Sequence, residues 1–146
     1  MKNILFLALF AIAAGLRAQD LKTELQNYAK AFQDANNRGD AETLNALYAD
    51  EVVMIDARDG NKTTVTRAQI KEQDLKNFSE NDDQMNIIVD SAESLDDGRV
   101  RVQGSVTGVS TNRKTGAKTN YSGTYDHLLV RVNGQWKLCE MKFRPQ

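Results

Sequence analysis

The chain has 146 residues, 40% of them hydrophobic, and a formal net charge of −1, which suits one globular domain. Its 19 basic and 20 acidic side chains are scattered, so no basic surface for nucleic acid is expected. With one histidine and one cysteine, Cys139, the chain has too few ligands for a metal site and no internal disulfide, and no cofactor is indicated.

The first eighteen residues have the organisation of a secretory signal peptide. A positive start at Lys2 precedes an apolar run over residues 4–16, which is too short to span a bilayer. Cleavage is expected after Ala18. The sequence therefore predicts a signal peptide over residues 1–18 and one domain over residues 19–146, exported to the periplasm or the medium and not held in a membrane after cleavage.

The mature part begins with helical patterns. Asp20 is a suitable N-cap, and apolar residues recur at helical spacing up to Gly39, where a helix should end. A second, short helix is expected after Asp40. A third should begin at Thr66, which has the capping-box partner Gln69 three residues later.

The rest of the chain has the two-residue period of strands. Two short strands are expected at residues 52–56 and 62–66, and a four-stranded antiparallel meander follows from Gln84 onward. Glycines inside these strands favour bends, so the sheet should be curved. The pattern predicts an α+β fold: a cone-shaped curved antiparallel sheet with three helices from the N-terminal half packed on its concave face.

Three stretches resemble the nuclear transport factor 2-like superfamily, which includes SnoaL-like domains and ketosteroid isomerases. They are FQDANNRGDAETLNALYADEVVMID (residues 32–56), TRAQI (66–70) and YDHLLVRVNGQWKLCEMKF (125–143). The resemblance extends over essentially the whole mature chain and implies a conical, mostly apolar cavity. It does not decide the function, because this fold hosts isomerases, dehydratases, cyclases and non-catalytic binding modules.

Asp56 is the main catalytic candidate that the resemblance implies. It ends an apolar strand where ketosteroid isomerases have the aspartate that acts as general base. The tyrosine and protonated aspartate that stabilise the oxyanion there correspond to Phe32 and Leu128 here, neither of which can donate a hydrogen bond. Asp56 is interpreted in three ways: as a catalytic base, as a cavity residue that orients a ligand, or as a solvated acid at a strand end.

Other side chains are assigned to the cavity by alternation. If Leu128 faces inward, Asp126 shares its face, and Tyr28 with Asp126 could replace the missing donors. His127 then points the other way, alongside Tyr125, and is interpreted as a structural or interface residue. The predicted ligand-binding residues are Tyr28, Phe32, Met54, Asp56, Asp126, Leu128, Cys139, Met141 and Phe143.

Trp136, Leu138 and Glu140 are expected on the opposite face of the last strand, against a helix or a second subunit. From the resemblance, the outer face of the sheet that carries Trp136 is expected to form a homodimer. Three functions are compatible with these patterns. The first is an exported domain that binds a small apolar molecule. The second is a proton-transfer enzyme of the isomerase, dehydratase or cyclase type with Asp56 as base. The third is a non-catalytic dimeric interaction domain. The missing donors favour the first over the second.

Overall fold

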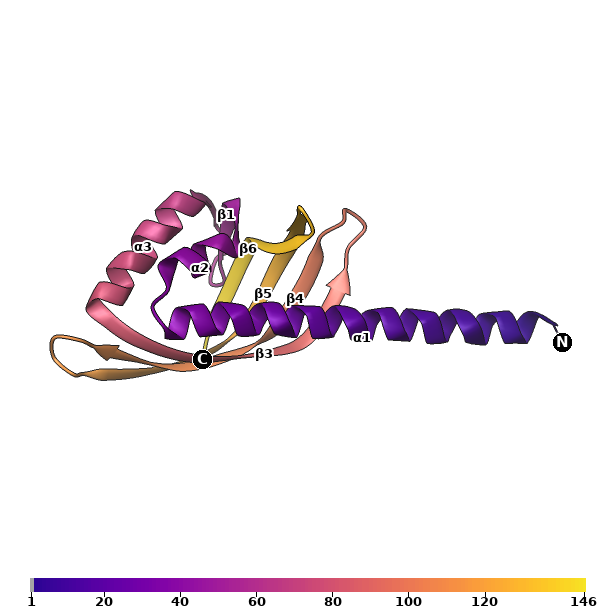
Figure 1. Cartoon of the computed structure of the whole chain (residues 1–146), viewed down its shortest axis with the longest axis horizontal. Coiled ribbons are helices and arrows are strands. Elements are labelled where there is room, and N and C mark those ends of the chain that lie inside the picture. Colours follow the sequence, from indigo (N-terminus) through magenta and orange to yellow (C-terminus); the bar gives the residue numbers. More distant parts are fainter. Residues whose placement is uncertain (1) are drawn as a thin grey trace.

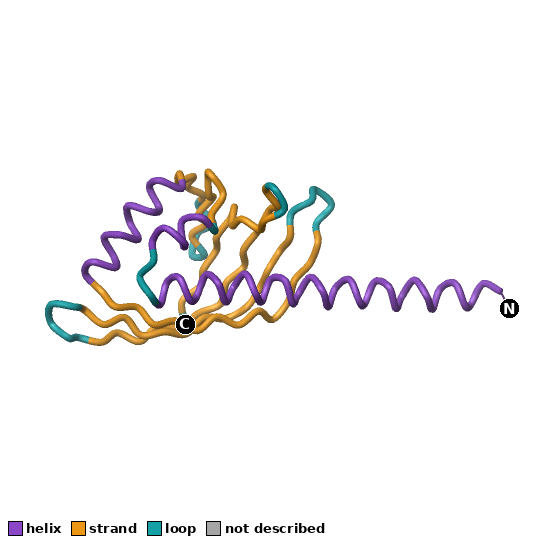
Figure 2. Tube along the Cα trace, viewed as in Figure 1, coloured by secondary structure: helices purple, strands orange, loops and turns teal. Residues whose placement is uncertain are grey.

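The computed structural model describes residues 2–146, with side chains from Gln19 onward. Its elements are α1 (Lys2–Asn37), α2 (Ala41–Ala46), β1 (Tyr48–Asp56), β2 (Lys62–Thr66), α3 (Arg67–Glu80), β3 (Asn81–Ser94), β4 (Val100–Asn112), β5 (Lys118–Val132) and β6 (Gln135–Pro145). The helices lie over one face of a curved sheet, and the N-terminal half of α1 projects beyond it (Figures 1 and 2). The predicted α+β fold is confirmed. Among residues 2–146, no helix is both long and apolar enough to cross a membrane.

The sheet has six strands in the order β2-β1-β6-β5-β4-β3 and is mixed. The meander β3 to β6 and the pair β1–β2 are antiparallel, as predicted, but β1 runs parallel to β6. The expectation of a wholly antiparallel sheet was therefore wrong at this junction. Short turns set the antiparallel direction of the strands within the β1–β2 pair and within the meander β3 to β6. The strands β1 and β6 are far apart in the chain and meet only through tertiary packing.

Local signals at the helix ends are partly confirmed. The Asp40 carboxylate accepts from the Thr43 backbone N–H at 3.0 Å, and Thr66 with Gln69 forms the predicted capping box. Asp20 was expected to cap the first helix, but it lies inside α1, because the residues before it continue the helix.

Amide side chains of α1 tie the helix to β3, the edge strand of the sheet. Asn37 accepts from the Met85 backbone N–H at 2.7 Å and donates to the Met85 carbonyl at 2.9 Å. One helical turn earlier, Gln33 accepts from the Ile87 N–H at 2.8 Å. These bonds satisfy backbone groups that an open edge would leave unpaired, and they fix α1 over the concave face.

The core lies between α1, α2 and the concave face of the sheet. Its largest fully buried side chains are Leu25, Leu44, Leu129, Leu138 and Val52. On the sheet side the core is incomplete, and a cavity remains next to α1.

Candidate ligand-binding site

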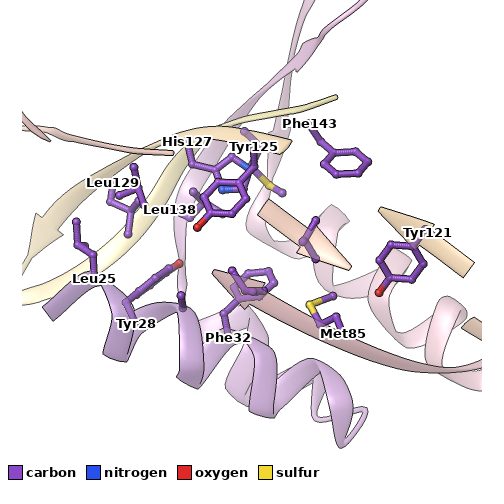
Figure 3. Close-up of a pocket in the computed structure, with 15 residues that line it drawn as sticks. Leu25, Tyr28, Phe32, Met85, Tyr121, Tyr125, His127, Leu129, Leu138 and Phe143 are labelled. Atoms are coloured by element: carbon purple, nitrogen blue, oxygen red, sulfur yellow. The ribbon is translucent and has the colours of Figure 1, made fainter. Parts of the chain in front are cut away.

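The cavity between α1 and the sheet has a volume of about 260 Å³. Its lining residues come from α1 and from β3 to β6 and are mostly aliphatic or aromatic (Figure 3). They are Leu25, Tyr28, Ala29, Phe32, Met85, Ile87, Val102, Val106, Tyr121, Tyr125, His127, Leu129, Leu138, Met141 and Phe143. Among the described side chains, no acidic or basic residue other than His127 belongs to this lining.

Glycines beneath aromatic rings shape the sheet side of the cavity. Gly104 pairs with Tyr125 and Gly108 with Tyr121 in the β4–β5 register. A Cβ atom at Gly108 would lie 2.3 Å from the Tyr121 ring, so the ring occupies the space of a missing side chain. Phe143 lies over Gly123 in the same way, at 2.4 Å. The rings can therefore lie close to the sheet and leave room between sheet and helix.

Two tyrosine hydroxyls beside the cavity are already hydrogen-bonded. Tyr28 donates to the Leu47 carbonyl at 2.8 Å, and Tyr125 donates to the Ile88 carbonyl at 2.9 Å. Burial raises the pKa of both phenols above the ordinary value of 10.0. Both tyrosines are therefore neutral, and each hydroxyl proton is held by the backbone.

His127 has a different environment. Its ring stacks against Tyr125 with the centroids 4.7 Å apart and the planes inclined by 32°. Its Nε2 atom is buried and has no hydrogen-bond partner among the described residues. Burial lowers the pKa of the imidazole from 6.5 to about 4, although the nearby Asp126 acts in the opposite direction. The ring is therefore neutral at neutral pH.

Four of the predicted ligand-binding residues line the cavity: Tyr28, Phe32, Met141 and Phe143. The other five, Met54, Asp56, Asp126, Leu128 and Cys139, are not part of the lining.

The face of β5 was assigned the wrong way round. Tyr125 and His127 point into the cavity, and Asp126 lies on the opposite face with Leu128. Arg101 donates from Nε to Asp126 at 2.8 Å, and Gln103 donates to it at 3.1 Å. Asp126 therefore does not pair with Tyr28. Apolar residues occupy both faces of this part of β5, so alternation by itself did not identify the inner face.

A bulge in β6 explains the misplaced residues of the last strand. Leu128 pairs with Glu140 but Leu129 pairs with Leu138, so Cys139 is an extra residue without a partner in the register. The bulge resets the alternation, so that Leu138 lines the cavity together with Met141. The Cys139 thiol instead contacts the Leu128 carbonyl at 3.3 Å.

Of the two partners expected for Trp136, the structure shows the helix, because Trp136 lies on the helix side of the sheet. Its Nε1 donates to Glu24 of α1 at 3.0 Å, and the Arg131 guanidinium lies 4.2 Å from its ring centroid. Trp136 therefore fastens β6 to α1 and is not part of the outer face.

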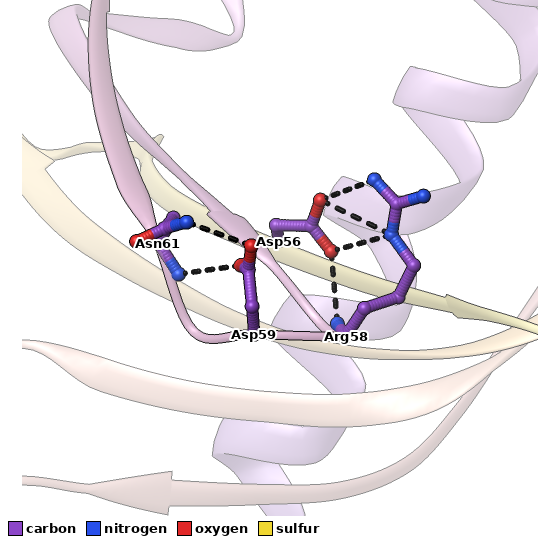
Figure 4. A network of polar contacts seen from close by, with 4 residues as sticks. All are labelled: Asp56, Arg58, Asp59 and Asn61. Atoms are coloured by element: carbon purple, nitrogen blue, oxygen red, sulfur yellow. Dashed lines mark hydrogen bonds and ion pairs between the residues drawn. The ribbon is translucent and has the colours of Figure 1, made fainter.

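Asp56 is the last residue of β1, next to the turn that leads to β2, and it lies outside the cavity lining (Figure 4). It accepts from Arg58 at 2.8 Å from the backbone N–H, at 3.0 Å from Nε and at 2.6 Å from Nη2. These hydrogen bonds lower the pKa of the carboxyl from 3.8 to about 2, and its side chain is 32% exposed. Asp56 is therefore a solvated, ion-paired acid at a strand end, and a poor proton acceptor for a molecule in the cavity.

Replacement of Asp56 by Asn should leave the cavity unaffected. The ion pair with Arg58 is exposed, and exposed ion pairs contribute little to stability, so the urea midpoint should stay close to that of the unmodified protein. Urea unfolding and titration with an apolar dye measure the two effects. Asp59→Asn, in the adjoining turn, is the matched control, because among the described residues Asp59 accepts its side-chain hydrogen bonds from Asn61. A tenfold loss of dye affinity in Asp56→Asn but not in Asp59→Asn would contradict the location of Asp56 outside the cavity.

A family model described as the SnoaL-like domain matches residues 18–142. The chain belongs to the SnoaL-like domain family. The resemblance to the nuclear transport factor 2-like superfamily is thereby confirmed. No curated protein sequence matches this SnoaL-like protein.

Three solved structures illustrate the shared fold. A conserved protein from Planctomyces limnophilus DSM 3776 has a TM-score of 0.73 at 14% identity, covering 85% of this chain and 96% of that one. A ketosteroid isomerase-like protein from Erwinia carotovora atroseptica SCRI1043 has a TM-score of 0.70 at 20% identity, covering 84% and 94%. An NTF-2 like protein of unknown function from Shewanella oneidensis MR-1 has a TM-score of 0.65 at 14% identity, covering 83% and 96%. At these identities the likeness concerns the fold alone.

Sequence reasoning missed His127 as a cavity residue, along with several aliphatic positions. One signal was present in the sequence. Gly104 and Gly108 are four residues apart, as are Tyr121 and Tyr125 on the next strand. Such matched spacings allow each ring to pair with a glycine across the strands, which indicates that the two tyrosines, and His127 with them, share one face of the sheet.

Proposed function

We propose that this SnoaL-like domain binds a small, neutral, mostly apolar molecule in the cavity between α1 and the sheet. The observation that carries the proposal is the cavity itself, about 260 Å³ with an almost wholly apolar lining. Apolar cavities of about 150 Å³ stay dry and accept benzene, so a molecule of one or two rings suits this volume. An ionised ligand would lose its hydration without gaining an opposite charge, which disfavours acids and amines.

Filling the cavity should abolish binding. Val106 lines the cavity and Thr107, the next residue of β4, is exposed. Val106→Trp is therefore expected to weaken binding of naphthalene at least about tenfold by occupying its site, since most of the binding free energy comes from apolar contact. Thr107→Trp adds the same side chain outside and should retain the affinity of the unmodified protein.

Fluorescence titration measures both affinities, and circular dichroism verifies that both variants are folded. Unchanged affinity in a folded Val106→Trp variant would contradict the proposal, as would failure of the unmodified protein to bind any apolar probe.

We also propose that the protein is exported and cleaved after Ala18. The support is the charged start and the apolar run of residues 2–18, whose side chains lie outside the described part of the structure. The intact mass of protein recovered from the periplasm or medium should equal that of residues 19–146. A mass that includes Lys2 would contradict cleavage.

A homodimer formed by the outer face of the sheet is likewise a proposal. Because Trp136 contacts α1, the interface would depend on the outer face of β4 to β6, where Leu128 lies among polar side chains. Arg101, Gln103 and Asp126 already form one hydrogen-bonded cluster there.

A further inference from the structure

The Tyr121 hydroxyl differs from the other two tyrosine hydroxyls of the cavity lining. Tyr28 and Tyr125 donate their hydroxyl protons to the carbonyls of Leu47 and Ile88. While these bonds are made, the two oxygens can only accept from a bound molecule. The Tyr121 hydroxyl has no hydrogen-bond partner among the described residues, and its oxygen is not one of their fully buried polar atoms. Its proton is therefore accessible and available to a ligand.

Tyr121 lies where the cavity opens. Together with Met85 it also lines an adjoining, more open groove, to which Asn37 and Gln84 contribute amide side chains. Phe143, which lies toward the same end of the lining in Figure 3, is an exposed aromatic residue. The Tyr121 hydroxyl is therefore at the boundary between the apolar cavity and a polar mouth.

The surroundings of Tyr121 favour a neutral partner. Burial, and after it the charge of Asp83, raises the pKa of the Tyr121 phenol above the ordinary value of 10.0, so the hydroxyl keeps its proton at neutral pH. The Asp83 carboxylate accepts from Asn77 at 2.6 Å. This carboxylate would repel an anionic group placed at the Tyr121 hydroxyl, whereas a carbonyl or ether oxygen can accept the proton without carrying a charge.

We propose that Tyr121 determines the specificity of the cavity by donating its hydroxyl proton to a neutral oxygen acceptor, such as a carbonyl or ether oxygen, on a small ring compound. This inference rests on the proposed function and adds to it the polar end of the ligand and the direction in which the ligand lies. The ring extends toward Leu25 and Leu129 at the opposite end of the lining, and the oxygen stays at the mouth (Figure 3).

The test compares 2-acetylnaphthalene with 2-isopropenylnaphthalene, which have nearly the same shape because a CH₂ group replaces the carbonyl oxygen. In Tyr121→Phe the affinity for the ketone relative to the alkene should fall about fivefold, since one hydrogen bond is lost. The cost of removing the ketone from water is the same for both proteins and cancels in this comparison. Isothermal titration calorimetry measures the four affinities.

Tyr48→Phe is the matched control. Tyr48 is buried in the core and does not belong to the cavity lining, so the same loss of a hydroxyl there should retain the affinity ratio of the unmodified protein. Circular dichroism verifies that both variants are folded.

A second readout follows the hydrogen bond itself. The carbonyl of 2-acetylnaphthalene labelled with ¹³C at that position resonates further downfield when it accepts a hydrogen bond. The bound ketone is therefore expected to resonate further upfield in Tyr121→Phe than in the unmodified protein. A change of cavity shape alone would alter affinity without removing this downfield displacement.

The outcomes separate this inference from the proposed function. The inference requires both the lower affinity ratio and the upfield resonance in Tyr121→Phe, and an unchanged ratio in Tyr48→Phe. If the probes bind and any of these results is missing, the role of Tyr121 is overturned and apolar binding stands. If neither probe binds the unmodified protein, both proposals are overturned.

One measurement needs only the unmodified protein and decides the matter where Tyr121→Phe does not fold. A nuclear Overhauser effect between the acetyl methyl group and the Tyr121 ring, together with a carbonyl resonance downfield of its position in hexane, supports the inference. Absence of either signal overturns it.

Discussion

Gly104→Ala is expected to lower the free energy of unfolding by about 3 kcal/mol, the upper end of the usual cost of overpacking. A Cβ atom at Gly104 would lie 1.9 Å from the Ile88 carbonyl oxygen and 2.5 Å from the Tyr125 hydroxyl oxygen. The first contact is with backbone and cannot be relieved by rotating a side chain. The second opposes the hydrogen bond from Tyr125 to that same carbonyl. The added methyl group must therefore push β3 away from β4 or drive the Tyr125 ring into the cavity.

Urea unfolding followed by circular dichroism measures this loss. Thr107→Ala, on the exposed face of the same strand, is the control and should change the free energy of unfolding by less than about 1 kcal/mol. If Gly104→Ala is as stable as the control, this result would contradict the close contacts of Gly104 with the Ile88 carbonyl and Tyr125.

Lowering the pH from 6.5 to 4 is expected to destabilise the protein through His127. Its folded pKa is about 4 and its ordinary pKa is 6.5, so the unfolded chain binds more protons between these values. The free energy of unfolding therefore falls as the pH falls through this window. The shift corresponds to a loss of about 3 kcal/mol at most from this residue.

Asp74 of α3 should partly mask this effect. Its Oδ2 atom is buried without a partner among the described residues, and burial raises the pKa of its carboxyl from 3.8 to about 6. The folded state then binds the proton more tightly than the unfolded state. Asp74 stabilises the fold fully below pH 3.8, and this contribution is lost as the pH rises through 6. The two residues therefore act in opposite directions between pH 4 and 6.

Two variants separate these contributions. Asp74→Asn should steepen the loss of stability between pH 6.5 and 4, because the His127 effect is then unopposed. His127→Phe should reverse the slope below pH 6. Urea unfolding at several pH values provides the measurement. A His127→Phe protein with the pH profile of the unmodified protein would show that the imidazole is not buried in the fold.

Elements specified by neighbouring residues were predictable from the sequence. The Thr66–Gln69 capping box and the Asp40 cap depend on residues three positions apart, and both form. The turn at Asn133-Gly134 joins β5 to β6 directly, with φ values of 50° and 77° that glycine and asparagine tolerate well. These local choices determined the order of helices and strands, the meander and hence the α+β class.

The sequence by itself also determined which residues of β5 share a face, because alternation puts His127 on the face of Tyr125 and opposite Asp126. Only the tertiary structure decided which face is inside. The helix α1 covers the face that carries His127, whereas Asp126 lies on the other face and accepts a hydrogen bond from Arg101. The bulge at Cys139 and the parallel pairing of β1 with β6 were decided in the same way. Alternation distinguishes two faces of a strand, but burial, register and strand partners depend on contacts between residues far apart in the chain.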